Sequence, residues 1–157
     1  MDMFNIFKKK KSLKAICNGK CIPLESVNDE VFSSKMMGDG IAIIPTSNIV
    51  VSPVKGKVNM IMEESKHALS ILSEDGIELL IHIGLDSVKL KGEGFKLLTK
   101  INEEVNVNTP LIEFDIESLK ENNIDSTIMI IITNDIYIEK ICIDEDVIAG
   151  KSVVVQY

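Results

Sequence analysis

The sequence contains no arginine and no tryptophan, and aromatic residues make up only 4% of it. All 17 basic residues are therefore lysines, which excludes a bidentate guanidinium clamp on a phosphate group. Any phosphoryl chemistry in this chain must depend on histidine, lysine and backbone N–H groups.

Long apolar runs are also absent, since none approaches the roughly 18 residues that a membrane-spanning helix requires. The opening residues, MDMFNIFKKKK, place their lysines after the apolar residues and lack a small-residue cleavage site, unlike a secretory signal. With 157 residues, 45% of them hydrophobic, the chain can form one domain with a single core. We therefore expect a globular cytoplasmic protein.

Cysteine is scarce and unevenly spaced, at Cys17, Cys21 and Cys142. An odd number, with three residues between the first two, matches neither a disulfide framework nor a zinc knuckle. We expect reduced, buried or half-buried thiols, and we predict no metal site and no cofactor.

The net charge is −7, although residues 1–14 contain a run of four lysines and a fifth at Lys14. The remainder is thus strongly acidic, which argues against a nucleic-acid partner and favours a protein partner with a basic face. We predict a basic N-terminal tail over residues 1–14 and one domain over residues 15–157. Two interpretations of the tail stay open: a solvated, frayed segment, or a short amphipathic helix in weak contact with an anionic membrane.

Short segments rich in β-branched residues dominate the domain, and Gly, Pro, Asn and Asp separate them. These segments are residues 41–44, 49–51, 58–62, 68–72, 77–83 and 128–132. Their spacing predicts an all-β fold, an antiparallel β-sandwich or barrel-sandwich hybrid. Minor short helices are expected over residues 116–122 and 135–138.

Two weak internal echoes are present in the sequence. Residues 18–22 resemble residues 55–59, and residues 104–111 resemble residues 146–153. Two similar halves folded over each other would explain both echoes.

The chain has two histidines, His67 and His82, and they flank a hairpin pattern, HALSILSEDGIELLIHIG. A four-residue loop over residues 73–76 places the rings directly opposite, with Cβ atoms about 4.5–5.5 Å apart. A two-residue loop places them diagonally on one face, and only an odd-length loop separates them onto opposite faces. The four-residue loop, which we expect, also puts Leu69 and Leu80 on the histidine face.

Imidazole suits reversible phosphoryl transfer, because most of it is neutral and nucleophilic at pH 7 and the phosphorus–nitrogen bond is labile. A second imidazole can hydrogen-bond a phosphoryl oxygen and stabilise the transition state. One alternative is a pair of ordinary half-exposed histidines. Another is a zinc peptidase site, which needs at least three protein ligands and usually a His-x-His pair that is missing here.

Several blocks of the sequence resemble the glucose-family IIA domains of bacterial sugar phosphotransferase systems. Residues 79–95, LLIHIGLDSVKLKGEGF, resemble the segment around the phosphorylated histidine of that family. Five other blocks also match the family, and they occur in its order and spacing. These blocks are GDGIAIIP (38–45), SPVKGKV (52–58), ESKHALSI (64–71), PLIEFD (110–115) and a late Thr133-Asn134 pair. The likeness spans about residues 15–157.

The resemblance implies a phosphotransferase component that works through a phosphohistidine intermediate. Nε2 of His82 would accept the phosphoryl group from the phosphocarrier protein HPr and donate it to a cysteine of a IIB domain of a sugar permease. His67 would stabilise the phosphoryl group, and Ser65 would orient His67. The backbone carbonyl of Gly84 would hold Nδ1 of His82.

The expected partner-binding face combines two lines of reasoning. The resemblance contributes the acidic residues Asp29 and Asp86 and the apolar residues Phe32 and Met37. The hairpin pattern contributes Leu69 and Leu80.

Departures from the family pattern leave the required chemical groups in place. Ser87 stands where threonine is usual, and Asn102 and Asn108 replace glycines, whose left-handed conformation asparagine tolerates. A second hypothesis is a regulatory binding module that uses the same face, with phosphorylation as its switch. The resemblance assigns the choice of sugar to the membrane component.

Overall fold

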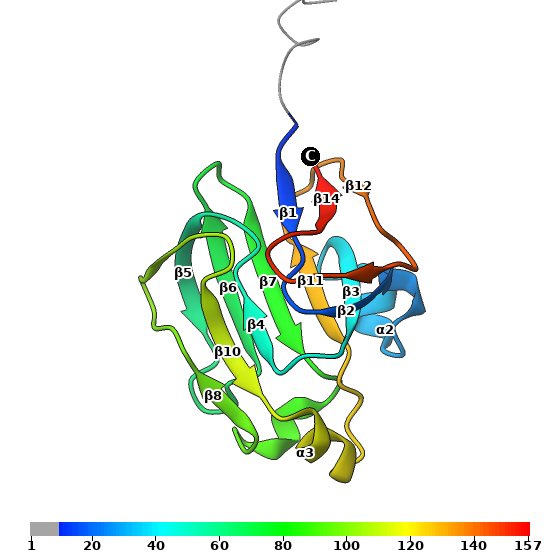
Figure 1. Ribbon diagram of the computed structural model, residues 1–157, viewed down its shortest axis with the longest axis vertical. Helices are drawn as coiled ribbons and strands as arrows, with labels where there is room; N and C mark the ends of the chain where they lie inside the picture. Colours follow the sequence, from blue (N-terminus) through cyan, green and yellow to red (C-terminus); the bar gives the residue numbers. More distant parts are fainter. Residues whose placement is uncertain (1–9) are drawn as a thin grey trace, which may run out of the picture.

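Antiparallel pairing connects the strands of the computed structural model, which describes residues 10–157 (Figure 1). The strands are β1 (Ser12–Lys14), β2 (Gly19–Pro23), β3 (Asp39–Pro45), β4 (Ile49–Val51), β5 (Gly56–Ile61), β6 (Ala68–Ser73), β7 (Glu78–Ile83), β8 (Phe95–Leu97), β9 (Glu104–Val105), β10 (Pro110–Phe114), β11 (Ile128–Ile132), β12 (Glu139–Lys140), β13 (Asp146–Val147) and β14 (Val153–Gln156). The helical segments are η1 (Leu24–Ser26), α2 (Glu30–Ser33), η2 (Ser87–Leu90) and α3 (Ile116–Glu121).

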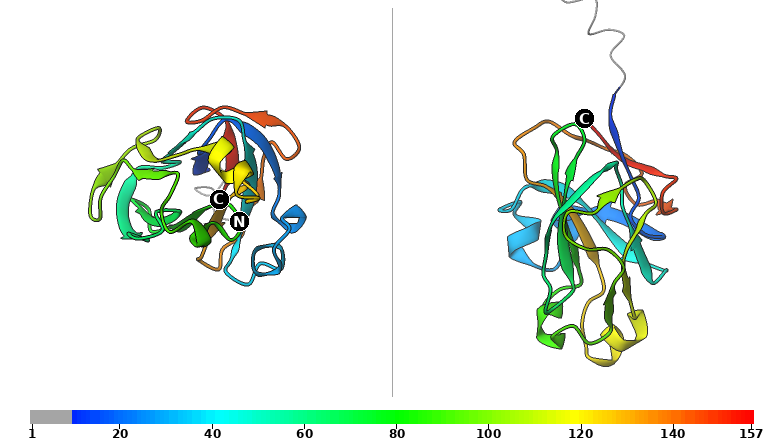
Figure 2. Two further views of the ribbon diagram at one scale, coloured as in Figure 1. Left: turned by 90° about the horizontal axis from the view of Figure 1, so that it is seen from below. Right: turned by 90° about the vertical axis from the view of Figure 1, so that its left-hand side faces the viewer.

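Eight strands form the largest sheet, in the order β13-β2-β3-β11-β7-β6-β5-β9. Two three-stranded sheets, β4-β10-β8 and β1-β14-β12, complete the fold. In the right-hand view of Figure 2, α2 lies on one side of the large sheet and β14 on the other. The expected all-β antiparallel sandwich is confirmed, with each expected strand within two residues of its observed ends.

The internal echoes correspond to equivalent strand pairs at the two ends of the large sheet. Strand β2 pairs with β13, where Lys20 lies opposite Asp146. Strand β5 pairs with β9, where Lys57 lies opposite Glu104. Each end of the sheet is thus closed by the same kind of short edge strand.

The β6–β7 hairpin differs from the expected register. Ser73 N donates to the Ile77 carbonyl at 2.8 Å, which leaves the three-residue loop Glu74-Asp75-Gly76. Gly76 has φ +90°, the conformation that a three-residue hairpin loop requires at this position. The Ser73 hydroxyl also accepts the Ile77 N–H at 2.8 Å and hydrogen-bonds Asp75, so it stabilises the odd-length loop.

The odd-length loop moves β6 by one residue, and His82 lies opposite Ala68 instead of His67. Leu69 therefore faces the main core, where it is fully buried, and the prediction that it lines the partner face is wrong. Leu80 keeps its expected place on the outer face beside His82.

His67 reaches the outer face in spite of this shift, because it precedes β6. The turn before it passes through Lys66 at φ +58°, and Lys66 N donates to the Met62 carbonyl at 2.7 Å. The His67 carbonyl still accepts Ile83 N–H at 2.8 Å, so the residue is fixed to β7 by its backbone. Its side chain is free of the strand alternation that controls Leu69.

The helix expected over residues 135–138 is absent, while α3 is confirmed within one residue. Asn134 explains the difference, because its side chain accepts Glu78 N–H at 2.7 Å and donates to the Gly76 carbonyl at 3.3 Å. These bonds fasten the segment to the β6–β7 hairpin in an irregular conformation. Helix α2, which the sequence did not indicate, is one short turn.

A tail is predicted over residues 1–14, and residues 1–9 of it lie outside the described residues. Of the remainder, Ser12–Lys14 form β1, which pairs with β14. Strand structure thus begins before residue 15. No helix among residues 10–157 has both the length and the apolar character to cross a membrane.

Apolar residues cover both faces of the central strands. The main core contains the inward residues of β3, β6, β7 and β11, including Ile41, Ile71 and Ile81. A smaller cluster on the outer face packs Phe32 of α2 and Leu24 of η1 against Leu80 and Met129. This second cluster surrounds His82.

The corrected register predicts unequal costs for two truncations in β6. Leu69→Ala should reduce the free energy of unfolding by about 2–5 kcal/mol, because the side chain is fully buried in the main core. Leu72→Ala in the same strand should cost about 0.5 kcal/mol or little more, because Leu72 is 44% exposed. Chemical denaturation measures both losses, and a larger loss for Leu72→Ala than for Leu69→Ala would show that β6 is shifted back by one residue.

Candidate functional site

His82 lies on the outer face of β7, in the centre of the large sheet. Across the neighbouring strand β11 it pairs with Met129. The Phe32 ring of α2 packs on the imidazole, with centroids 4.9 Å apart and planes inclined by 55°. The site is thus an imidazole set in an apolar surface.

Helix α2 is placed by its first residue. Asp29 has extended backbone geometry, and its carboxylate accepts the Val31 N–H at 2.9 Å as a helix N-cap. This cap starts the turn that carries Phe32 onto His82. It also leaves Asp29 close enough for its charge to act on the imidazole.

His67 meets His82 edge to face. The ring centroids are 4.6 Å apart and the planes are inclined by 86°. Nδ1 of His67 shares a 2.7 Å hydrogen bond with the Ser65 hydroxyl, which is itself buried. The bond at Nδ1 directs the other ring nitrogen, Nε2, away from Ser65.

The alternative of two ordinary half-exposed histidines does not describe this pair, because the two side chains differ in exposure. His67 is 3% exposed, whereas His82 is intermediate. Among the described residues, the buried side-chain nitrogen and oxygen atoms without a partner are Nδ1 of His82 and Oγ1 of Thr99. Nε2 of His67 is not among them.

Burial controls the charge of both rings. The pKa of His82 is lowered to about 4, chiefly by desolvation and to a smaller extent by the neighbouring His67. The Gly84 carbonyl and the carboxylates of Asp29 and Asp86 act in the opposite direction and raise this pKa, but they do not prevail. Desolvation also lowers the pKa of His67. Both imidazoles are therefore neutral at pH 7.

Gly84 begins the turn after β7 with φ +79°. Its carbonyl favours a proton on His82. Nδ1 of His82 is buried and makes no hydrogen bond of good geometry, so that carbonyl is the acceptor available to it.

Of the other predicted partner residues, Asp29, Phe32 and Asp86 act on His82 directly, and Leu80 belongs to the outer cluster with Phe32. Met37 is 42% exposed in the turn after α2. Asp86 has φ +58° before η2, and its carboxylate lies 3.8 Å from Lys89 Nζ. Leu80 is 9% exposed.

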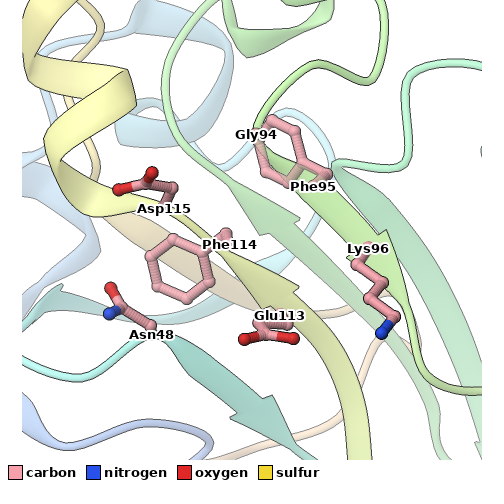
Figure 3. Close-up of a pocket in the computed structure, with 7 residues that line it drawn as sticks. All are labelled: Asn48, Gly94, Phe95, Lys96, Glu113, Phe114 and Asp115. Atoms are coloured by element: carbon pink, nitrogen blue, oxygen red, sulfur yellow. The ribbon is translucent and has the colours of Figure 1, made fainter.

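Met62 and Val88 are exposed apolar residues beside Ser65 that the sequence reasoning missed. They are 43% and 51% exposed, and they line a cavity of about 870 Å³ together with Ser65. Their positions directly beside the ESKHALSI and HIGLDS blocks could have indicated them. A cavity of about 410 Å³, drawn in Figure 3, is lined by residues of β8 and β10 together with Asn48, and neither histidine lines it.

The described residues contain no arrangement of side chains suited to a metal ion. No group of three or more His, Cys, Asp or Glu side chains in residues 10–157 is arranged to hold a metal ion. Cys17 and Cys21 are buried and Cys142 is half-buried, and all three are free thiols. Burial raises the pKa of Cys21 to about 12, which keeps it protonated.

Comparison with known proteins identifies the family. The sequence model of the phosphoenolpyruvate-dependent sugar phosphotransferase system, EIIA 1, matches residues 11–137. This chain belongs to that family. It is therefore an EIIA phosphotransferase component of sugar transport, and the resemblance seen in the sequence is confirmed.

Relatives of known name agree with the family. The chain is 43% identical over 155 residues to the glucose-specific EIIA component of Buchnera aphidicola subsp. Acyrthosiphon pisum, covering 98% of this chain and 94% of the relative. It is 52% identical over 116 residues to the glucoside-specific EIICBA component of Staphylococcus carnosus, covering 74% of this chain but only 17% of that protein.

A solved structure has the same fold. The glucose permease IIA from Mycoplasma capricolum superposes with a TM-score of 0.85 at 36% sequence identity, and 99% of each chain is covered. The β-sandwich of this EIIA component is thus shared with an experimentally determined relative.

The low pKa of His82 has a measurable consequence for pH dependence. An NMR titration of the ring should give a midpoint near pH 4, with no charge change between pH 6 and pH 8. Because this pKa lies below the ordinary value of 6.5, the neutral ring stabilises the fold above pH 6.5, and the contribution is lost as pH falls toward 4. His82→Gln should therefore lose less stability across this window than the parent protein. A midpoint near 6.5 would contradict the buried, neutral ring.

Proposed function

We propose that this EIIA component accepts a phosphoryl group from HPr on Nε2 of His82 and donates it to a cysteine of a IIB domain, in the cytoplasm. The observation that carries the proposal is the edge-to-face contact of His82 with His67 at 4.6 Å. Two neutral imidazoles at this distance can both reach the oxygens or the phosphorus of one phosphoryl group.

In the accepting step, the lone pair on Nε2 of His82 forms a bond to phosphorus while the bond from phosphorus to the donor atom breaks. In the donating step, a cysteine thiolate forms the new bond to phosphorus, and the electron pair of the phosphorus–nitrogen bond returns to Nε2. No proton or electron is left over in either step. The accepting step uses a neutral His82, which burial maintains, and the donating step regenerates that neutral ring.

His67 stabilises the phosphoryl group as it leaves His82. Its Nδ1 is held by Ser65 at 2.7 Å, so Nε2 can donate a hydrogen bond to a phosphoryl oxygen when it carries the proton. A neutral donor holds the group less tightly than a lysine would, which suits a carrier that must release it.

The surroundings of His82 favour transfer to a protein with a basic face. Bound phosphate adds about two negative charges beside the carboxylates of Asp29 and Asp86. The repulsion favours release, and basic residues of the partner offset it during docking. Phe32, Met37 and Leu80 provide the apolar part of the same surface.

The EIICBA relative supports a IIB domain as the acceptor. That protein, named as a glucoside-specific EIICBA component, matches this chain over a fraction of its length, and its name includes a B part beside the A part. We propose that this chain donates to the corresponding part of a sugar permease.

Two substitutions separate the roles of the histidines. Incubation with labelled phosphoenolpyruvate, Enzyme I and HPr should label the parent protein, and His82→Ala should abolish labelling because the nucleophile is gone. His67→Gln should still be labelled, but donation to IIB should slow by about 100-fold, because the donor to the phosphoryl oxygen is displaced. The measurement is radiolabel on each protein after a timed quench.

Labelling of His82→Ala at the parent level would show that another residue is the nucleophile. The label on the parent protein should also be lost in acid and kept in base, as expected of a phosphohistidine. A base-labile, acid-stable label would indicate a serine phosphate and would contradict the proposal.

A further inference from the structure

The turn after His82 is held by two side chains that the phosphoryl chemistry does not use. Ser87 is fully buried, and its hydroxyl donates to the Ile83 carbonyl at 2.5 Å. On the other side of the turn, the Asp125 carboxylate accepts the backbone N–H and the hydroxyl of Thr127, at 2.9 and 2.7 Å.

The Ser87 hydroxyl and the backbone carbonyls of Asp125 and Thr127 hold the two peptide groups that flank Gly84, and the Asp125 carboxylate orders the segment that supplies those carbonyls. The peptide between Ile83 and Gly84 is held at its carbonyl by Ser87 and at its N–H by the Thr127 carbonyl, 2.9 Å away. The next peptide, between Gly84 and Leu85, is held at its N–H by the Asp125 carbonyl at 2.9 Å.

A trans peptide is planar, and its N–H and C=O point in opposite directions. The bond from Leu85 N–H to Asp125 therefore turns the Gly84 carbonyl away from Asp125. On that opposite side lies His82, whose buried Nδ1 has no other partner. A hydrogen bond from Nδ1–H to this carbonyl would keep the proton on Nδ1 and the lone pair on Nε2.

Close packing prevents the turn from relaxing. A methyl group in place of the Gly84 hydrogen would lie 3.1 Å from Ser87 Cβ and 3.2 Å from the Asp125 carbonyl oxygen. Gly84 thus sits between the two supporting residues with almost no free space.

We propose that Ser87 and Asp125 are positioning residues, which hold the peptides around Gly84 so that its carbonyl binds Nδ1–H of His82 and leaves the lone pair on Nε2. This inference rests on the proposed phosphorylation of His82 for its functional consequence. The tautomer itself is a property of the unphosphorylated protein, so it is measured without any phosphoryl donor.

The test is the tautomer of His82 in ¹⁵N-histidine-labelled protein at pH 7, read from the chemical shifts of the two ring nitrogens. The parent protein should show mainly the Nδ1–H form. Ser87→Ala and Asp125→Ala should each shift the equilibrium toward Nε2–H by about 2- to 10-fold, the effect of one lost hydrogen bond. Phosphoryl acceptance should fall by the same factor as the Nδ1–H population.

Conservative variants and a matched serine control the test. Ser87→Thr keeps the hydroxyl and Asp125→Asn keeps the accepting oxygen, so both should restore the parent tautomer. Ser73→Ala removes another buried hydroxyl, which accepts Ile77 N–H at the far end of β7. It should reduce stability and leave the tautomer of His82 unchanged.

The outcomes separate this inference from the proposed function. Parent-like tautomers in Ser87→Ala and Asp125→Ala, with His82 still phosphorylated, would overturn the positioning role alone. Shifted tautomers in a protein that never accepts a phosphoryl group would uphold the positioning role and overturn the proposed function. A shift of equal size in Ser73→Ala would also overturn the inference, because it would reflect general loosening of β7.

Discussion

The proposed mechanism depends on one contact, the edge-to-face approach of the His67 and His82 rings. His82 is fixed by a central strand that is hydrogen-bonded on both sides. His67 reaches it only because Lys66 turns through a left-handed conformation just before β6 begins. Ser65, Phe32 and the Gly84 turn then act on rings that this arrangement has already brought together.

The strands and the identity of the site residues could be predicted from the sequence, but the hairpin register could not. Strands β6 and β7 are covered on both faces, so Leu79, Leu80 and Ile81 are all apolar and buried, and periodicity carries no information about facing. The hydrogen bonds of Ser73 stabilise a three-residue loop in place of the expected four-residue loop. The rings meet because His67 lies outside the ladder that the register argument assumed.

Other features depend on contacts between distant segments. Helix α2 is too short for periodicity to reveal, and it is stabilised by the Asp29 cap and by packing of Phe32 on the sheet. The irregular segment after β11 is set by Asn134 bonds to the far hairpin. The low pKa of His82 results mainly from its burial in the folded protein. Sequence patterns indicated the chemistry, and tertiary packing determines its electrostatics.

The central claim is that His67 contacts the phosphoryl group carried by His82. The most direct test is an NMR titration of His67 before and after phosphorylation of the protein. The pKa of His67 should rise on phosphorylation, because about two negative charges would then lie within hydrogen-bonding distance and favour the protonated ring. A His67 pKa that does not change on phosphorylation would place the phosphoryl group out of reach and contradict the shared site.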